Sequence, residues 1–296
     1  MKTVTEHLVA MGSDMKAMLK ELLHTHARLG RMPEHDSVVW IGPQGVWEPL
    51  GVEGRQLQSR LLRLLDQYGP LVATLLRGQR AQDHRKLTEY LDRLRHTIEQ
   101  SQLTWEANTA QAETKAVAAI DGIEHLLAGC YDPSAGQPIF APDTNALIYN
   151  PALEAWRFEG ATPFRLALTP AVTSELDRLK INHRVEEVRK KAERVIRTIK
   201  GYRARGSLLE GVPLVRGVSE VFQIATEPDM TATLPWLDPS NDDDRFLAST
   251  IEVMRLHPRS AVIIVTRDIN LQNKAELARI PFVEPPEGEV GEAVAP

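Results

Sequence analysis

Residues 261–266 read AVIIVT, a continuous apolar run rich in β-branched side chains. Such a run predicts a strand buried on both faces, as in a parallel sheet that helices cover. Further strands are expected at PIFAP (138–142), FRLALT (164–169) and residues 220–225, with helical patterns between them, including one long helix over about residues 171–200. The alternation predicts an α/β fold built from βαβ units around a parallel sheet.

The first 132 residues show a different pattern. Apolar side chains recur at steps of three and four over residues 57–76, 87–98 and 117–127, which is typical of amphipathic helices. Gly69-Pro70 predicts a kink or a break in the first of these. We therefore expect a mainly α-helical N-terminal domain over residues 1–132, packed as an antiparallel bundle.

Two further segments interrupt these patterns. Residues 38–54 hold four glycines and two prolines between short apolar runs, which predicts a β-hairpin near residues 38–50. The end of the chain, PPEGEVGEAVAP (285–296), is rich in Pro, Gly and Glu, and this composition predicts disorder. The α/β domain is then expected to span residues 137–284.

Composition excludes several classes of protein. Hydrophobic residues make up 43% and charged residues 25% of the chain, close to the average of globular proteins. The single cysteine, Cys130, rules out an intrachain disulfide and a cysteine-rich zinc site. The sequence has no P-loop, HExxH or GxSxG motif. It also has neither the apolar core of a signal peptide nor a membrane-spanning stretch, so we expect a cytoplasmic protein.

Acidic side chains lie just after the predicted strands. Asp143 comes directly after PIFAP, Asp268 comes shortly after AVIIVT, and Glu175 lies early in the helix after FRLALT. The run Asp242-Asp243-Asp244 precedes a helix that begins near Phe246. In open parallel sheets, ligands bind beyond the carboxyl ends of the strands. The sequence therefore predicts three or four carboxylates at one edge of the sheet.

Crowded carboxylates repel one another unless a cation neutralises them. Oxygen ligands favour Mg²⁺ or Mn²⁺, and such a site supports hydrolysis of a phosphodiester. Polar neighbours would orient the ligands from the second coordination shell: Thr144, Asn145, Thr266 and Asn270. Each acidic residue could instead serve only as a helix cap or a first-turn residue. Four such residues at one sheet edge favour the metal site over four separate caps.

Four stretches carry a resemblance to a known family. They are PIFAPDTNALIYNP (138–151), LTPAVTSELDRLK (168–180), SNDDDRFLAST (240–250) and AVIIVTRDINLQNKA (261–275). In this order they resemble the PIN-domain family of nucleases over residues 137–284. The resemblance implies a three-layer α/β/α sandwich and a divalent-metal ribonuclease.

The same resemblance implies the roles of individual residues. The catalytic acidic set would be Asp143, Glu175, Asp243 and Asp268. Asp244 is the alternative third member, because the aspartate run leaves that position ambiguous by one residue. The implied metal ligands are Asp143, Asp243, Asp244 and Asp268.

A basic segment begins soon after Glu175. The net charge of the whole chain is −5, yet residues 178–205 hold eleven Lys or Arg and three Glu, which gives +8. This segment predicts a surface that binds the nucleic-acid backbone; the alternative is a solvated helix face with Glu–Lys and Glu–Arg pairs. The predicted contacts are Arg184, Arg189, Lys190, Lys191, Arg194, Arg197 and Lys200.

These observations lead to one main hypothesis, a Mg²⁺- or Mn²⁺-dependent endoribonuclease. The N-terminal helices would position RNA, recruit a protein partner or drive self-association. Two alternatives stay open at this point. One is a structure-selective DNA nuclease, and the other is a non-catalytic RNA-binding or adaptor protein.

Overall fold

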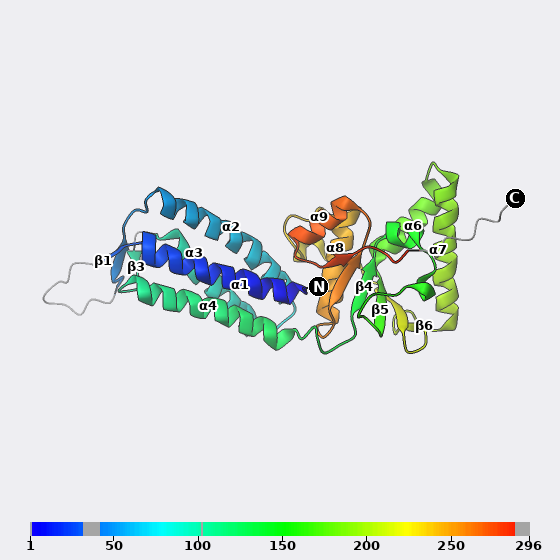
Figure 1. Cartoon of the computed structure of the whole chain (residues 1–296), viewed down its shortest axis with the longest axis horizontal. Coiled ribbons are helices and arrows are strands. Elements are labelled where there is room, and N and C mark those ends of the chain that lie inside the picture. The colour runs from blue at the N-terminus through cyan, green and yellow to red at the C-terminus, as the bar shows by residue number, and fades with distance from the viewer. Residues whose placement is uncertain (1, 32–41, 102, 288–296) are drawn as a thin grey trace. The chain divides into compact units, whose positions relative to one another are not determined.

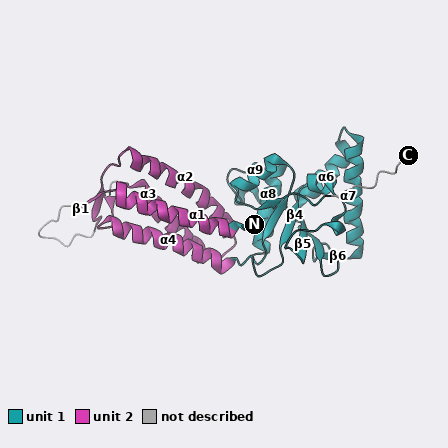
Figure 2. Cartoon of the chain, in the orientation of Figure 1, with its two compact units in different colours: residues 1–4, 131–296 teal, residues 5–130 magenta. Residues whose placement is uncertain are grey.

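The computed structural model describes residues 2–31, 42–101 and 103–287. The chain divides into two compact units. One comprises residues 5–130, and the other comprises residues 131–296 together with residues 1–4, as Figure 2 shows. Among the described residues, no helix is both long enough and apolar enough to cross a membrane.

The unit formed by residues 5–130 is a helix bundle (Figure 1). Its helices are α1 (Val4–Glu21), α2 (Val52–Leu75), α3 (Ala81–Glu99) and α4 (Thr109–Cys130), and a π-helical turn, Leu22–His26, extends α1. The apolar stripes of these helices face one another and form the core, as the 3.6-residue period requires.

Helix α2 corrects one expectation from the sequence. It runs without a break through Gly69-Pro70. Tyr68, Leu71 and Val72, on either side of the proline, are all buried. Packing of this apolar stripe therefore keeps the two halves of α2 in one helix despite the hydrogen bond that proline cannot donate.

A small antiparallel sheet accompanies the bundle. Its strands, in the order β1-β2-β3, are Leu29–Arg31, Gly45–Trp47 and Leu103–Thr104. Of the hairpin predicted near residues 38–50, one strand is present at Gly45–Trp47. This strand pairs with Leu29–Arg31, which lies outside the predicted segment. Residues 38–41 of that prediction lie outside the described residues, as do residues 288–296 of the predicted disordered tail.

The second unit is built on a six-stranded sheet in the order β6-β7-β5-β4-β8-β9. All neighbouring strands are parallel except β6 and β7. The strands are β4 (Ile139–Pro142), β5 (Phe164–Leu168), β6 (Val212–Val215), β7 (Ser219–Gln223), β8 (Val262–Val265) and β9 (Phe282–Val283). Every residue of β4 and β8 is buried, which confirms the central parallel strands that the apolar runs predict.

Helices cover both faces of this sheet (Figure 1). They are α5 (Thr144–Tyr149), α6 (Pro170–Asn182), α7 (Glu186–Arg205), α8 (Asp242–Leu256) and α9 (Ile269–Leu277), with 3₁₀ turns at Leu153–Ala155 and Met230–Ala232. Right-handed crossovers place helices on opposite faces when the strand order reverses direction at β4. The three-layer α/β/α sandwich is thereby confirmed.

The single long helix expected over residues 171–200 is wrong, because the chain forms α6 and α7 there. His183 ends α6 in an extended conformation, with φ −69° and ψ 136°. The Val185 N–H donates to His183 Nδ1 (3.1 Å), and Arg189 Nη1 donates to the His183 carbonyl (2.6 Å). These local hydrogen bonds replace the helical ones and turn the chain between the two helices.

Strand β6 is not predicted by the sequence pattern. It is an edge strand of four residues that contains Pro213, whose position is exposed. Proline is tolerated at a sheet edge, where its missing N–H faces no neighbouring strand.

Candidate active site

The carboxyl end of β4 is where the strand order of the sheet reverses. The chain leaves β4 toward β5 on one side and later returns to β8 on the other. β4 and β8 are in register at Pro142 and Val265, and the Asp143 N–H donates to the Val265 carbonyl (3.0 Å). Such a reversal leaves a crevice beyond the strand ends in which α/β proteins bind ligands.

Asp143 occupies this position, and both of its carboxylate oxygens are engaged. Oδ1 accepts from the Ala146 N–H at 2.6 Å and so caps α5. Oδ2 accepts from Thr266 Oγ1 at 2.5 Å, across the two strands. The residue is only 6% exposed. Asp143 is therefore a helix cap and also a buried carboxylate held at the sheet edge, and its role as a metal ligand stays a prediction.

Asp268 lies beside it on the next strand connection. Its Oδ1 caps α9 by accepting from the Asn270 N–H at 2.8 Å. Its own N–H donates to Thr266 Oγ1 at 2.9 Å. The Thr266 hydroxyl therefore joins Asp268 to Asp143 through two hydrogen bonds.

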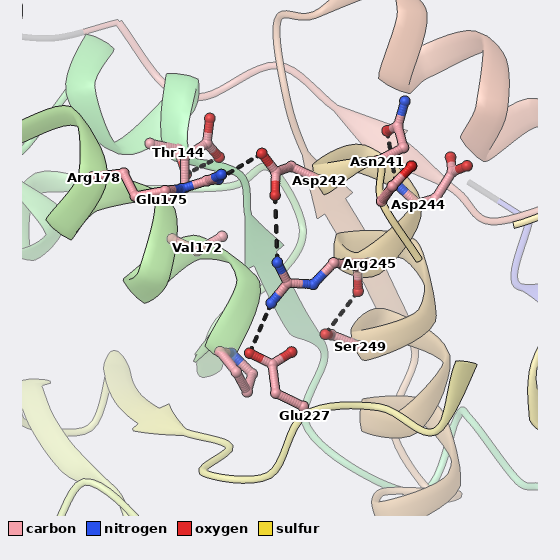
Figure 3. Close-up of polar contacts among 12 residues, drawn as sticks. Thr144, Val172, Glu175, Arg178, Glu227, Asn241, Asp242, Asp244, Arg245 and Ser249 are labelled. Atoms are coloured by element: carbon pink, nitrogen blue, oxygen red, sulfur yellow. Dashed lines mark hydrogen bonds and ion pairs between the residues drawn. The ribbon is translucent and has the colours of Figure 1, made fainter. Parts of the chain in front are cut away.

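Glu175 reaches the same edge from α6. Its Oε2 accepts from Thr144 Oγ1 at 2.7 Å, and Thr144 comes directly after Asp143 (Figure 3). Two threonines thus contact three acidic residues: Thr266 binds the Asp143 carboxylate and the Asp268 N–H, and Thr144 binds the Glu175 carboxylate. Thr144 and Thr266 have the orienting contacts expected of them, whereas the side chains of Asn145 and Asn270 are exposed.

The pKa shifts reflect this crowding. The pKa of Asp143 is raised to about 6: burial raises it most, the negative charges of Glu175 and Asp268 add to the increase, and the hydrogen bonds from Thr266 and Ala146 oppose it. Burial likewise raises the pKa of Glu175, and the charges of Asp242 and Asp243 add to the increase. Neighbouring carboxylates therefore lie close enough to disfavour ionisation of Asp143 and Glu175.

The aspartate run 242–244 opens α8, and its three side chains have different partners. Asp242 pairs with Arg178 Nη2 (2.5 Å) and Arg245 Nη1 (3.5 Å), as Figure 3 shows. Asp244 is buried and accepts from the Asp238 N–H at 2.9 Å. Asp242, which the sequence does not assign to the site, therefore lies nearest to the Glu175–Arg178 side of the cluster.

Lys274 holds the other two aspartates. Its Nζ lies 2.8 Å from Asp244 Oδ1 and 3.3 Å from Asp243 Oδ2, and it donates to Asn241 Oδ1 at 3.1 Å. Lys274 lies on α9, thirty residues after Asp244, so no local pattern in the sequence pointed to it. Arg178 and Arg245 were missed for a related reason, because a cation that pairs within the site looks like any surface cation.

The predicted nucleic-acid contacts lie on α7 or just before it. Arg189 is used at the α6–α7 turn, and Lys190, Lys191 and Arg197 pair with glutamates one turn earlier on α7. Three others are exposed, and no carboxylate of the described residues pairs with them: Arg184, Arg194 and Lys200. The Glu–Lys and Glu–Arg pairs of the alternative are present on α7, and nucleic-acid binding stays a prediction for the three residues without a carboxylate partner in the described chain.

Divalent cations suit this donor set. No three His, Cys, Asp or Glu side chains of residues 2–31, 42–101 and 103–287 are arranged to hold a metal ion. The chemistry of the residues nevertheless suits one, since neighbouring negative charges raise the pKa values of Asp143 and Glu175 and a bound cation would offset that repulsion. Asp143, Asp268 and Glu175 are the residues that would hold it.

A parallel sheet with acidic side chains gathered at its switch point is an arrangement suited to phosphodiester hydrolysis. Residues 140–284 match the family model of the PIN domain, and this half of the chain is a PIN domain. PIN domains are generally nucleases and typically use divalent metals such as Mg²⁺. The match does not extend to the helix bundle. No curated protein shows significant similarity to the chain.

Proposed function

We propose that this chain is a divalent-metal-dependent endoribonuclease whose active site is the acidic edge at β4 and β8. One observation carries the proposal: at the topological switch point, Thr266 donates to the Asp143 carboxylate and accepts from the Asp268 N–H, while Thr144, the residue after Asp143, donates to the Glu175 carboxylate. Structural caps need no such links between them.

The residues at this edge would have separate roles. Asp143, Asp268 and Glu175 would hold the cation, which when bound would polarise a water and offset negative charge on the phosphate. Thr266 and Thr144 fix the orientation of the carboxylates through their hydroxyl groups. Arg178, beside Glu175 and Asp242, is placed to attract a phosphate to this edge.

Basic side chains outside the edge support a nucleic-acid substrate. Arg184, Arg194 and Lys200 are exposed and have no carboxylate partner among the described residues, so they are available to phosphates. RNA is proposed over DNA on the resemblance to ribonucleases of this family. The helix bundle would add a surface for RNA or a protein partner, and exposed Leu103 and Trp105 support such a surface.

The test is cleavage of matched substrates by the purified chain. End-labelled linear RNA, circular RNA, the same sequences as DNA, and duplexes of both are incubated with Mg²⁺, Mn²⁺ or EDTA. The proposal expects cleavage of linear and circular RNA with metal and none with EDTA. If only DNA is cleaved, the protein is a DNA nuclease and not a ribonuclease. If RNA is bound but not cleaved with any metal, the protein is a non-catalytic RNA-binding protein.

Variants assign that cleavage to the acidic edge. Asp143→Asn and Glu175→Gln keep side-chain size and remove charge, and each is expected to lower the rate at least roughly 100-fold. Asp177→Asn is the matched control, because Asp177 is exposed on α6 two residues after Glu175. Cleavage by Asp143→Asn and Glu175→Gln at the rate of the Asp177→Asn control would assign the activity to another part of the chain or to a contaminant.

A further inference from the structure

An exposed aromatic–cation pair lies next to the acidic edge. The guanidinium carbon of Arg267 lies 4.0 Å from the centroid of the Tyr149 ring. Tyr149 is 43% exposed and the Arg267 side chain is 47% exposed. The pair therefore presents a flat, cationic and partly apolar surface to solvent.

Both residues are tied to the proposed active site by the chain itself. Arg267 lies between Thr266 and Asp268, and Tyr149 ends the helix that Asp143 begins. Helix α5 has six residues, which puts Tyr149 about 9 Å along the helix axis from its start. At this distance, Tyr149 and the acidic edge could contact neighbouring nucleotides of one bound nucleic-acid strand.

Contacts within the chain do not account for the exposure of this pair. Among the described residues, Arg267 pairs with one acidic side chain, that of Glu284, and Arg267 Nε lies 3.8 Å from Glu284 Oε2. Ile269, the first residue of α9, is 70% exposed on the same connection. An exposed ion pair at that distance contributes little to stability, so a structural role does not explain why a tyrosine, an arginine and an isoleucine face solvent here.

We infer that Tyr149 and Arg267 form a stacking platform for an unpaired nucleobase beside the cleaved phosphate. This inference rests on the proposed function and deepens it, because it makes the enzyme selective for single-stranded RNA. Bases of a single strand stack on aromatic rings and on guanidinium planes. Bases within a duplex already stack on their neighbours and cannot use the platform. Arg267 also contributes a positive charge toward the adjacent phosphates.

The experiment measures binding without cleavage. Fluorescence anisotropy detects binding of a labelled single-stranded RNA and its duplex, both in EDTA, to the full chain and its variants. Tyr149→Ala is expected to weaken single-strand binding roughly five- to 100-fold, whereas Tyr149→Phe keeps the ring and stays within about twofold. Arg267→Lys keeps the charge but loses the planar group, and it is expected to weaken binding to the single strand more than to the duplex.

Arg216→Gln is the control for loss of one positive charge, because Arg216 is exposed in the turn between β6 and β7. It is expected to change binding to both RNAs equally and slightly. The inference is overturned if Tyr149→Ala binds the single strand as tightly as the unmodified chain, if single-strand and duplex binding fall together, or if the unmodified chain binds neither RNA. Suppose that the unmodified chain cleaves RNA with metal and that Tyr149→Ala leaves binding unchanged. The stacking platform is then wrong, but the proposed function stands.

Discussion

Lys274 Nζ and Asp244 Oδ1 are 2.8 Å apart, and this ion pair joins the start of α8 to α9. The same ammonium group is 3.3 Å from Asp243 Oδ2. A lysine therefore already neutralises the part of the aspartate run that the sequence assigns to the catalytic set, while Asp143, Glu175 and Asp268 have no such cation among their hydrogen-bond partners in the described chain.

Lys274→Met is expected to lower stability in EDTA and to increase the effect of metal. Without the ammonium group, Asp243 and Asp244 repel each other, and the unfolding free energy should fall by roughly 1–3 kcal/mol because Asp244 is buried. Added Mn²⁺ should then raise the melting temperature of the variant more than that of the unmodified chain. Thermal melts with EDTA and with Mn²⁺ measure both effects.

The control is Lys190→Met, which removes the same charge from an exposed pair with Glu186 on α7. It should leave the melting temperature nearly unchanged under both conditions. If Lys274→Met has the same melting temperatures as Lys190→Met under both conditions, the role given to the Lys274–Asp244 ion pair is wrong.

Thr266→Val tests whether the bridging hydroxyl orients the site. The valine keeps the shape but loses the hydrogen bonds to Asp143 Oδ2 and from the Asp268 N–H. The pKa of Asp143 should rise further, since the threonine lowers it. Mn²⁺ affinity, measured by calorimetric titration, should drop roughly 10- to 100-fold.

Thr250→Val provides the comparison for that experiment. Thr250 is also fully buried, but its hydroxyl donates only to the Phe246 carbonyl of its own helix, at 2.9 Å. Its replacement should leave Mn²⁺ affinity unchanged. If Thr266→Val and Thr250→Val bind Mn²⁺ with equal affinity, Thr266 does not orient the metal site.

His257 predicts a loss of stability in acid. It ends α8 and packs edge-on against Phe222, with ring centroids 5.1 Å apart. Burial and the charge of Arg165 lower its pKa below 6.5. The unfolded chain therefore binds the proton first as the pH falls, so the stability present above pH 6.5 is lost as the pH falls from 6.5 through the folded-state pKa.

His257→Gln should remove part of this dependence. We expect the difference in unfolding free energy between about pH 7.5 and 5.5 to become smaller, as measured by urea denaturation at each pH. His125→Gln changes an exposed histidine on α4 and serves as the control. An unchanged difference in the His257 variant would show that other groups cause the acid sensitivity.

Gly136→Ala is expected to destabilise the PIN domain. A Cβ atom at Gly136 would lie 2.5 Å from the Arg259 carbonyl oxygen and 2.8 Å from Ser260 Oγ. This close approach holds the segments that lead into β4 and β8 together, so relief requires backbone movement and should cost roughly 1–3 kcal/mol. Gly201→Ala, where α7 leaves open space, should instead stabilise by up to about 1 kcal/mol. Urea unfolding of both variants measures whether each substitution lowers or raises the unfolding free energy.

The sequence predicted the centre of the sheet and two of its acidic residues because those features are local. An apolar run with an acidic residue just after it indicates both a buried strand and the side chain at its carboxyl end, as at β8 and Asp268. The orientation of Asp242, Asp243 and Asp244 was not predictable, since consecutive helical residues point about 100° apart and their partners come from other elements. For the same reason, the sequence did not predict that Lys274 and Arg178 pair with these aspartates. The end of α6 at His183 was also hidden, because an imidazole and Arg189 stop this helix instead of glycine or proline.

The hydrogen bond between Thr266 and Asp143 joins residues 123 positions apart. β4 is the first strand of its sheet to be synthesised, yet its neighbour β8 is among the last. A growing chain that has not reached β8 lacks Thr266, Asp268 and Lys274 and leaves one side of β4 unpaired. The acidic edge can therefore assemble only once nearly the whole domain has been made.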